Sequence, residues 1–321
     1  MKKLEKSVPV IRFKGFSEAW EQRKFIEIIN RLSKTSNSSI LPKVEYEDII
    51  AEEGRLNKDI SNKFDSRKGI LFQPKNILYG KLRPYLKNWL YPDFKGVAVG
   101  DFWVFEAIEA TPRFIYNLIQ SDSYQKVAND TAGTKMPRSD WTKVSNSSFF
   151  IPKESSEQKR IGTFFKQLDD TIALHQRKLD TLKQMKKGLL QQMFPKSEED
   201  VPKIRFADFD EEWYQRKLGE EFEKINERND GSFGKTHWIS VAKMYFVEPN
   251  KVLSNNIDTR TYVMRKGDIA FEGHSNTDFK FGRFVANDIG PGIVSELFPV
   301  YRHKTNYDNN YWKNAIQLEH I

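Results

Sequence analysis

The most regular spacing of apolar residues lies between Ser155 and Phe194. Apolar side chains recur there in steps of four and three, and only His175 and Lys186 interrupt the series. This apolar stripe consists of Ile161, Phe165, Leu168, Ile172, Leu179, Leu182, Leu189 and Met193. Such a repeat keeps one face of a helix toward a partner helix, as in a coiled coil. An ordinary amphipathic helix packed on its own domain is the alternative interpretation.

Local signals define the two ends of this helix. Ser155 and Gln158 have the spacing of a capping box, and Pro195 stands where the helix should end. At about 1.5 Å per residue the helix would be roughly 55–60 Å long. Because that exceeds the width of a small domain, we expect the helix to be a spacer that connects separate globular bodies.

An internal duplication supports this interpretation. The segment Val8–Phe25 (VPVIRFKGFSEAWEQRKF) returns 193 residues later as Val201–Leu218 (VPKIRFADFDEEWYQRKL), with 11 of 18 positions identical. We therefore predict two tandem α+β modules with mixed, irregular β-sheets. Module one covers residues 1–154, the coiled-coil spacer helix residues 155–195, and module two residues 196–321. We expect the repeated aromatic residues to be core residues, not DNA-stacking ones; they are Phe16, Trp20, Phe209 and Trp213.

Short β-like runs rich in Val, Ile, Phe and Tyr alternate with Gly and Pro in module one. They predict strands at 69–72, 76–82, 97–107 and 147–152. Thr111-Pro112 predicts the start of a helix that continues to about Ala128. The stretches 31–43 and 132–141 are polar or turn-rich and are predicted to be loops.

Module two shows the same order of elements with a different sequence. Residues 265–271 and 292–302 stand where 74–80 and 96–106 stand in module one, and 309–318 matches the helix start. Two related modules whose sequences differ outside the opening segment are expected for two recognition domains with different targets. Divergence without a change of function gives the same pattern.

Composition narrows the class of protein. The formal net charge is +8 and 13% of the residues are aromatic, which favours nucleic-acid binding. The absence of cysteine excludes disulfides, thiolate catalysis and cysteine-based zinc sites. No apolar run approaches 18 residues and the start has no signal-peptide core, so we expect a cytoplasmic protein.

Catalytic motifs are missing from the sequence. We find neither the (N/D)PP(Y/F) loop nor the Gly-rich loop of a DNA adenine methyltransferase. GSFGKT at 231–236 resembles the end of a phosphate-binding loop, but Asn229 stands where its first Gly belongs. The five histidines show no metal-ligand spacing. We therefore predict a non-enzymatic chain that holds neither a metal nor a cofactor.

Four stretches together resemble the specificity (S) subunit, HsdS, of type I restriction-modification systems. They are the repeated VPxIRFxxF…W…QRK opening, NILYGKLRPYL with GVAVGDFWVF, AGTKMPR, and EQKRIGTFFKQLDDTIALHQRKLDTLKQMKKGLLQQMFPK. The resemblance implies two target recognition domains that each read one half of a split double-stranded DNA site. It also implies helices that bind two methyltransferase (M) subunits, and a motor/nuclease (R) subunit that joins the complex. S-adenosylmethionine, ATP and Mg are then expected on the partner subunits.

The sequence departs from the family pattern at its C-terminal side. Family members carry a second spacer helix that pairs antiparallel with the first, and the sequence has no counterpart of it. We therefore expect a truncated subunit whose apolar stripe recruits another copy or a partner's helix. The alternative function is an adaptor or decoy that binds the M subunit or another copy without reading DNA.

Candidate DNA-binding residues follow from the polar loops and from the resemblance. Phosphate contacts need Lys and Arg, and base contacts add Asn and Gln. In module one the candidates are Lys34, Tyr79, Lys81, Arg83, Tyr85, Lys87, Asn88, Lys135 and Arg138. In module two they are Arg228, Lys235, His274, Asn276 and Lys280. Surface loops with solvated charges are the alternative interpretation.

Overall fold

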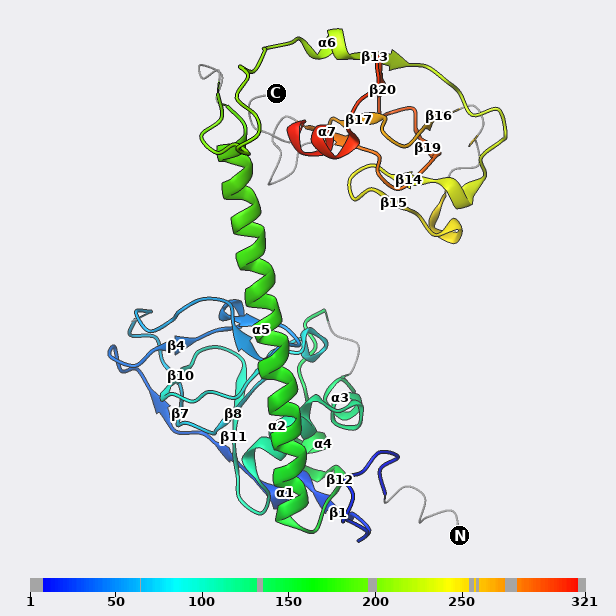
Figure 1. The fold of residues 1–321 in the computed structure, drawn as a ribbon. Coiled ribbons are helices and arrows are strands. Elements are labelled where there is room, and N and C mark those ends of the chain that lie inside the picture. Colours follow the sequence, from blue (N-terminus) through cyan, green and yellow to red (C-terminus); the bar gives the residue numbers. More distant parts are fainter. Residues whose placement is uncertain are drawn as a thin grey trace. The chain divides into compact units, whose positions relative to one another are not determined.

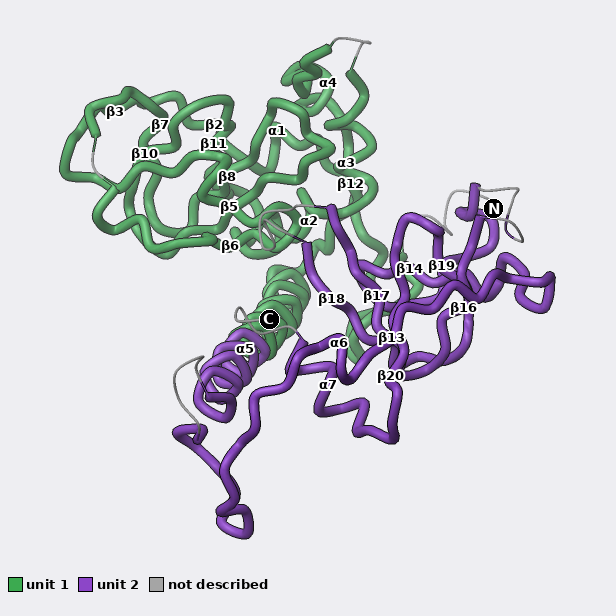
Figure 2. Tube along the Cα trace, turned by 90° about the horizontal axis from the view of Figure 1, so that it is seen from above, with its two compact units in different colours: residues 1–177 green, residues 178–321 purple. Residues whose placement is uncertain are grey.

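The computed structural model describes residues 8–63, 65–131, 135–195, 201–253, 257, 260–274 and 282–316. Contacts divide the chain into two compact units, residues 1–177 and 178–321 (Figure 2). The boundary lies within the helix α5 (Ser155–Met193), so each unit contains one module and part of this helix.

The first unit combines many short strands with four short helices that precede α5 (Figure 1). Its strands are β1 (Glu21–Lys24), β2 (Ile29–Leu32), β3 (Thr35–Ser36), β4 (Lys43–Val44), β5 (Ile49–Ile50), β6 (Arg55–Leu56), β7 (Gly69–Phe72), β8 (Ile77–Gly80), β9 (Trp89–Leu90), β10 (Gly96–Ala98), β11 (Phe102–Ala107) and β12 (Ser148–Ile151). Its short helices and 3₁₀ turns are α1 (Phe25–Ile28), α2 (Pro112–Gln120), α3 (Asp122–Ala128), α4 (Trp141–Asn146), η1 (Tyr46–Asp48) and η2 (Pro84–Leu86).

The central sheet of the first unit has the order β2-β11-β8-β9 and is buried on both faces. Alternate residues of a strand point to opposite faces, and β11 shows this directly. Trp103 and Phe105 pack with residues of α1 to α4, whereas Phe102 and Val104 pack with the second sheet, β3-β7-β10-β4. The unit is therefore built of three layers, with helices on one side of the central sheet and a sheet on the other.

Aromatic rings fill the helix side of this core. The ring of Phe25 lies 5.3 Å from that of Phe105, 5.1 Å from Tyr124 and 5.9 Å from Phe149. These edge-on and tilted arrangements are the favourable ones for aromatic pairs. Burial raises the pKa of Tyr124 well above its usual value, so its hydroxyl stays neutral.

The second unit contains the strands and short helices of module two (Figure 1). The strands are β13 (Phe222–Ile225), β14 (Ile239–Ser240), β15 (Tyr245–Phe246), β16 (Thr261–Met264), β17 (Ile269–Glu272), β18 (Arg283–Ala286), β19 (Gly292–Ser295) and β20 (Val300–His303). The helices and 3₁₀ turns are α6 (Leu218–Glu221), α7 (Asn309–Ala315), η3 (Lys235–His237) and η4 (Pro249–Lys251).

The two modules share one strand topology. The order β13-β20-β17-β18 repeats β2-β11-β8-β9, and the pair β16-β19 repeats β7-β10. The layers repeat as well, because Ala270 and Val300 pack with β14, β16 and β19 while Ile269 packs with α7. The duplication seen in the opening segments therefore extends through the body of each module, where the sequences differ.

Local signals in module one were partly misread. The expected strand at 97–107 is two strands, since Gly100 turns the chain with a φ of +101° between β10 and β11. The helix expected from Thr111 to Ala128 ends at Gln120, and Ser121 caps α3 through its side-chain oxygen. The loop expected at 132–141 is followed by the unpredicted helix α4, whose N-cap Asp140 accepts hydrogen bonds from Thr142 and Lys143. The stretch 31–43, expected to be a loop, contains the end of β2 and all of β3.

The long helix is present, but its start differs from the expectation. Gln158 does not close a capping box on Ser155, because its amide accepts from the backbone N–H of Thr111 at 2.8 Å and donates to the carbonyl of Pro152 at 2.9 Å. Glu157 is buried and forms a two-bond ion pair with Arg12 at 2.7 and 2.8 Å. These contacts fix the first turn of α5 to module one. With 39 residues, α5 spans about 58 Å.

The repeated aromatic residues are not core residues, which corrects the prediction. Phe16, Trp20 and Trp213 are half-buried, and Phe209 is 62% exposed. Trp20 instead donates its indole N–H to Glu157 at 3.3 Å and packs edge-on against Phe114. Trp20 thus connects its opening segment to the start of α5 and to α2, and Trp213 packs against Phe194 after the end of α5.

Candidate nucleic-acid interface

Two of the predicted DNA-binding stretches of module one lie side by side. The connection between β8 and β9 pairs with the residues before α4, with Leu82 bridged to Arg138. Arg83 donates its backbone N–H to Pro137 at 2.7 Å, and Ser139 donates to Lys81 at 2.8 Å. We call residues 81–88 and 135–138 the hairpin–loop cluster. Residues 54 to 58 positions apart in sequence thus form one surface.

Asp101, in the turn between β10 and β11, holds the cations of this cluster. Its carboxylate lies 3.0 Å from the guanidinium of Arg138 and 3.6 Å from the ammonium of Lys81. The hydrogen bond with Asp101 raises the pKa of Arg138 above its usual value. The hydroxyl of Tyr46 donates to the Asp101 carbonyl at 2.6 Å and accepts from the Leu82 backbone at 3.1 Å. One acidic turn therefore positions two basic side chains from separate segments.

The remaining cations of the cluster face solvent. Arg83 is exposed, Lys135 is exposed, and neither makes an ion pair within the described ranges. Lys87 pairs with Glu52 at 2.9 Å. The cluster thus carries more positive than negative charge, as a phosphate-binding surface requires.

Two predicted residues of this stretch are buried, which corrects the expectation for them. Tyr79 is 0% exposed and its ring packs on Tyr124 at 5.3 Å, and burial raises its pKa to about 12. Asn88 is 7% exposed. Tyr79 points to the helix side of the central sheet, because β8 alternates its faces, so neither side chain is available to DNA. Tyr85 is 55% exposed and stays a candidate.

Lys34 lies apart from the hairpin–loop cluster. It is exposed between β2 and β3, at the edge of the second sheet, and its carbonyl accepts from Leu71 at 2.8 Å. No contact links it to the cluster among the described residues, so the structure does not bring this candidate together with the others.

In module two a carboxylate holds two cations in the same way. Glu296 follows β19 and lies 2.8 Å from Arg228 and 3.0 Å from Arg260. The guanidinium of Arg228 also stacks over the ring of Tyr262 at 4.4 Å. Hydrogen bonds from Arg228 and then Arg260 lower the pKa of Glu296, so it stays charged.

The other predicted residues of module two have different outcomes. Lys235 is half-buried and donates to the carbonyl of Val252 at 3.1 Å. His274 is exposed, with its ring 6.1 Å from that of Phe298. Asn276 and Lys280 lie outside the described residues.

Sequence reasoning missed Asp101, Glu296 and Arg260. Both acidic residues lie in the turn between equivalent strands, β10–β11 and β19–β20, but Asp101 directly precedes β11 whereas Glu296 directly follows β19. Because they do not share one position in this turn, no signal in the sequence marked them. Arg260, which directly precedes β16, was not among the basic residues singled out from the polar loops.

The apolar stripe of α5 is largely open. Phe165, Leu168, Ile172, Leu179, Leu182 and Leu189 are 43–61% exposed. Ile161 is half-buried against the core of module one, and Met193 is half-buried as well. The other described helices have at most nine residues, so none of them pairs with α5 along its length. The coiled coil expected from the spacing is a single helix here.

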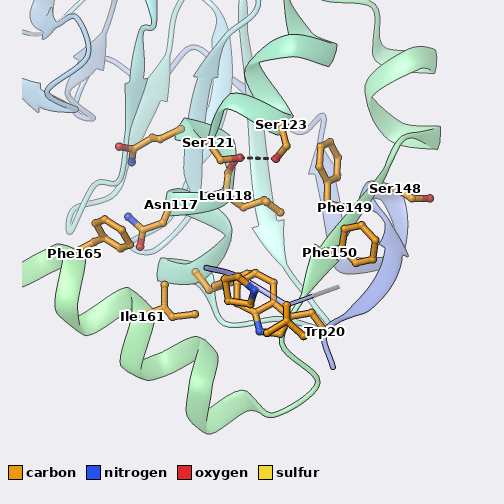
Figure 3. Close-up of a pocket in the computed structure, with 14 residues that line it drawn as sticks. Trp20, Asn117, Leu118, Ser121, Ser123, Ser148, Phe149, Phe150, Ile161 and Phe165 are labelled. Carbon is orange, nitrogen blue, oxygen red and sulfur yellow. Dashed lines mark hydrogen bonds between the residues drawn. The ribbon is translucent and has the colours of Figure 1, made fainter. Parts of the chain in front are cut away.

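A pocket of about 630 Å³ adjoins the start of the stripe (Figure 3). Its walls are Trp20 of the opening segment, Phe114 and Asn117 of α2, and Ile161 and Phe165 of α5. The side-chain oxygen of Asn117 is buried there without a hydrogen-bond partner among the described residues. Pocket and stripe therefore share Ile161 and Phe165.

Within the described part of the chain, no group of His, Asp and Glu has the arrangement of a metal site. Over the same residues, no helix is long and apolar enough to cross a membrane.

Comparisons with known proteins identify the family of the chain. Residues 17–184 match the model of the type I restriction modification DNA specificity domain, and the chain therefore belongs to this family. Its function class is DNA sequence recognition within type I restriction-modification. No curated protein sequence matches the chain.

Several solved structures are similar. One, which addresses complex assembly and conformational transition of the type I R-M system, has 17% identity and a TM-score of 0.50, covering 96% of this chain and 80% of that one. The type I S subunit from M. genitalium has 11% identity and a TM-score of 0.51, with 97% and 79% covered. The HsdS subunit from Thermoanaerobacter tengcongensis has 18% identity and a TM-score of 0.42, with 96% and 80% covered. The first two indicate a shared fold.

Proposed function

We propose that the chain reads a split DNA target, with one half-site for each module, and docks methyltransferase subunits through α5. The observation that supports it most is the repeated arrangement in which one carboxylate positions two cations, Asp101 in module one and Glu296 in module two. The carboxylate limits the side-chain freedom of cations that would otherwise be disordered, and arginine suits guanine edges while lysine and arginine suit phosphates.

The mechanism is placement, not chemistry on the DNA. The hairpin–loop cluster and the Arg228–Glu296–Arg260 group would each contact a groove of the half-site. The M subunits would bring S-adenosylmethionine to the target adenines, and the R subunit would bring the ATP- and Mg-dependent activities. The apolar stripe and the adjoining pocket support the docking part, because exposed apolar area of this length favours a partner helix.

Methylation mapping tests the whole proposal. The chain would be co-expressed with its cognate M subunit, purified as a complex, and the cellular DNA sequenced for methylated adenines. A split motif methylated on both strands is the expected result. A stable complex that methylates nothing would support the adaptor function instead, and an unsplit symmetric motif would show that only one module reads DNA.

The salt dependence of DNA binding tests the phosphate contacts. Arg83→Ala should weaken binding to all duplexes about equally and reduce the slope of log K against log salt by about 1. Lys153→Ala, which removes an exposed lysine between β12 and α5, is the matched control. Equal slopes for wild type and Arg83→Ala would remove Arg83 from the interface.

Charge placed on the stripe tests the docking surface. Leu168→Glu with Ile172→Glu should abolish co-purification of the M subunit while leaving the modules folded. Leu174→Glu is the control, because Leu174 is 59% exposed on the same helix but outside the stripe. Loss of the M subunit in both variants would mean that helix stability, not the stripe, decides the interaction.

A further inference from the structure

The tip of the hairpin–loop cluster combines exposed apolar side chains with a strained backbone. Tyr85 is 55% exposed and Leu86 is 41% exposed, both within the 3₁₀ turn η2. Arg83 and Lys87, which flank this turn, have φ angles of +49° and +54°. Non-glycine residues pay roughly 1–2 kcal/mol for this left-handed conformation, and such strain gathers at binding sites.

The surrounding backbone holds the tip in this conformation from three sides. Leu86 donates to the Arg83 carbonyl at 2.8 Å, and Arg83 donates to Pro137 at 2.7 Å. Glu52 donates to the Lys87 carbonyl at 3.0 Å, and Gly80 donates to Asn88 at 2.7 Å. The turn is therefore a rigid platform that shows two apolar side chains between two cations.

We propose that Tyr85 and Leu86 recognise the 5-methyl group of thymine in the major groove of the half-site read by module one. This inference rests on the proposed function of the chain. Among the groups that base edges present in the major groove, the thymine methyl is the apolar one, so an apolar reader distinguishes sequence there through it. Arg83 and Lys87 contact the flanking phosphates and set the depth of the turn.

Partial burial of the two side chains favours contact with a methyl group over insertion between bases. About half of the surface of Tyr85 and more than half of Leu86 is covered by the protein, so each presents a face to the partner. A wedge that unstacks a base step projects an apolar side chain into the stack and bends the duplex. Tyr85 and Leu86 therefore contact the thymine methyl group at the groove surface, and binding does not bend the DNA duplex.

Uracil substitution measures the contact directly. The full-length chain, with its M subunit where the complex is required for binding, would be titrated with duplexes of the selected target in which each thymine is replaced singly by uracil. Loss of a methyl group in contact should weaken binding about fourfold, at one or two positions of one half-site. The Leu86→Ala and Tyr85→Ala variants should bind thymine and uracil duplexes equally, whereas Tyr85→Phe should keep the preference.

Controls separate the possible failures. Ile108→Ala removes an apolar side chain of similar exposure, 54%, at the opposite end of β11, and should leave the thymine preference unchanged. Selective binding with no uracil effect at any position overturns this inference and leaves the proposed function intact. The bend of the bound duplex is measured by fluorescence transfer between its two ends. If the wild type bends the duplex and Leu86→Ala does not, Leu86 inserts between bases and the proposed methyl contact is overturned. Absence of selective binding to any duplex overturns both.

Discussion

Modules one and two share a framework but recruit their cations from different places. In both, an acidic residue in the turn before the long central strand holds two basic side chains: Asp101 before β11 and Glu296 before β20. In module one the cations come from the β8–β9 connection and from the residues before α4. In module two they follow β13 and precede β16. The shared strand order thus places the recognition residues at the same end of the central strand in both modules. The connections between the strands differ, and they supply different basic residues.

The two modules also meet different parts of α5. In module two the ring of Phe194, just after the helix, lies 5.7 Å from the rings of both Trp213 and Tyr311. In module one the corresponding pair, Trp20 and Phe114, faces the start of α5 and lines the open pocket of Figure 3. In both modules the aromatic pair lines a pocket, of about 630 Å³ in module one and about 500 Å³ in module two, and among the described residues only in module two does a ring at the end of α5 pack against the pair.

The largest expected contrast concerns the cores. Phe105 is 0% exposed and is surrounded by aromatic rings, whereas its counterpart Tyr301 in β20 is half-buried. Phe105→Ala should cost module one about 3–5 kcal/mol of unfolding free energy, and Tyr301→Ala should cost module two about 1–3 kcal/mol. Calorimetry of the full chain checks this through the transition of each module. Equal losses would show that the two cores are equally tight.

The next effect separates the two recognition sites. Asp101→Asn removes the charge that positions Lys81 and Arg138, and should reduce discrimination against base changes in one half-site about tenfold, within the usual 1–3 kcal/mol per base pair. Glu296→Gln should do the same for the other half-site only. Competition binding with singly mutated duplexes measures both, and a variant that affects both half-sites alike would contradict independent reading.

Acid should destabilise module one through Asp48. Burial alone would raise the pKa of this carboxyl, but hydrogen bonds from Lys63, the Glu45 backbone and Lys58 outweigh it, and its pKa lies below the usual value. The pKa of Asp48 is lower in the folded than in the unfolded protein, so the ionised carboxylate stabilises the fold. This stabilisation is complete above the pKa that Asp48 has in the unfolded chain, and it is lost as the pH falls through the pKa that it has in the folded protein.

Asp48→Asn checks this pH dependence. The variant should lower the stability of module one by about 1–3 kcal/mol at neutral pH, and the difference from wild type should shrink in acid. Denaturant titrations from pH 7 to pH 3 measure it, with module two as the internal reference. A constant difference across this range would mean that Asp48 does not carry the dependence.

The smallest effect compares the two glycines of α5. Gly188 has open space around it, so Gly188→Ala should stabilise the helix by about 0.5–1 kcal/mol. A Cβ at Gly162 would lie 2.8 Å from the Cγ of Arg113, so Gly162→Ala should gain nothing or lose stability. Circular dichroism during thermal unfolding measures both. A gain at Gly162 would show that the Arg113 side chain moves aside without cost.

The sequence predicted what depends on local periodicity and on repetition. The strand at 69–72, the helix start at Thr111 and the length of α5 all follow from local signals, and the duplicated opening indicated two modules. The break at Ser121 was missed because a serine that caps a helix competes with a continuous apolar pattern. Tyr79 was predicted to contact DNA because polar residues follow it in the sequence, and these obscure the pattern by which alternate residues of β8 point to opposite faces.

Most of the candidate site depends on contacts that no local pattern encodes. The pairing of Leu82 with Arg138, and of Arg228 and Arg260 with Glu296, joins residues that are 36 to 68 positions apart. Only the topology of the sheets brings them together. Lys81, Arg138 and Arg228 could be named from the sequence, but Arg260 and the two carboxylates that position these cations could not.

The ion pair between Arg12 and Glu157 has a consequence for the order of events during synthesis. Its partners are 145 residues apart, so at about 5–20 residues per second the opening segment waits roughly 7–30 s for Glu157 to be made. β1 waits almost as long for β12, since Glu21 pairs with Ile151. The first residues translated in module one are therefore among the last to find their places, and the start of α5 completes the module as it leaves the ribosome.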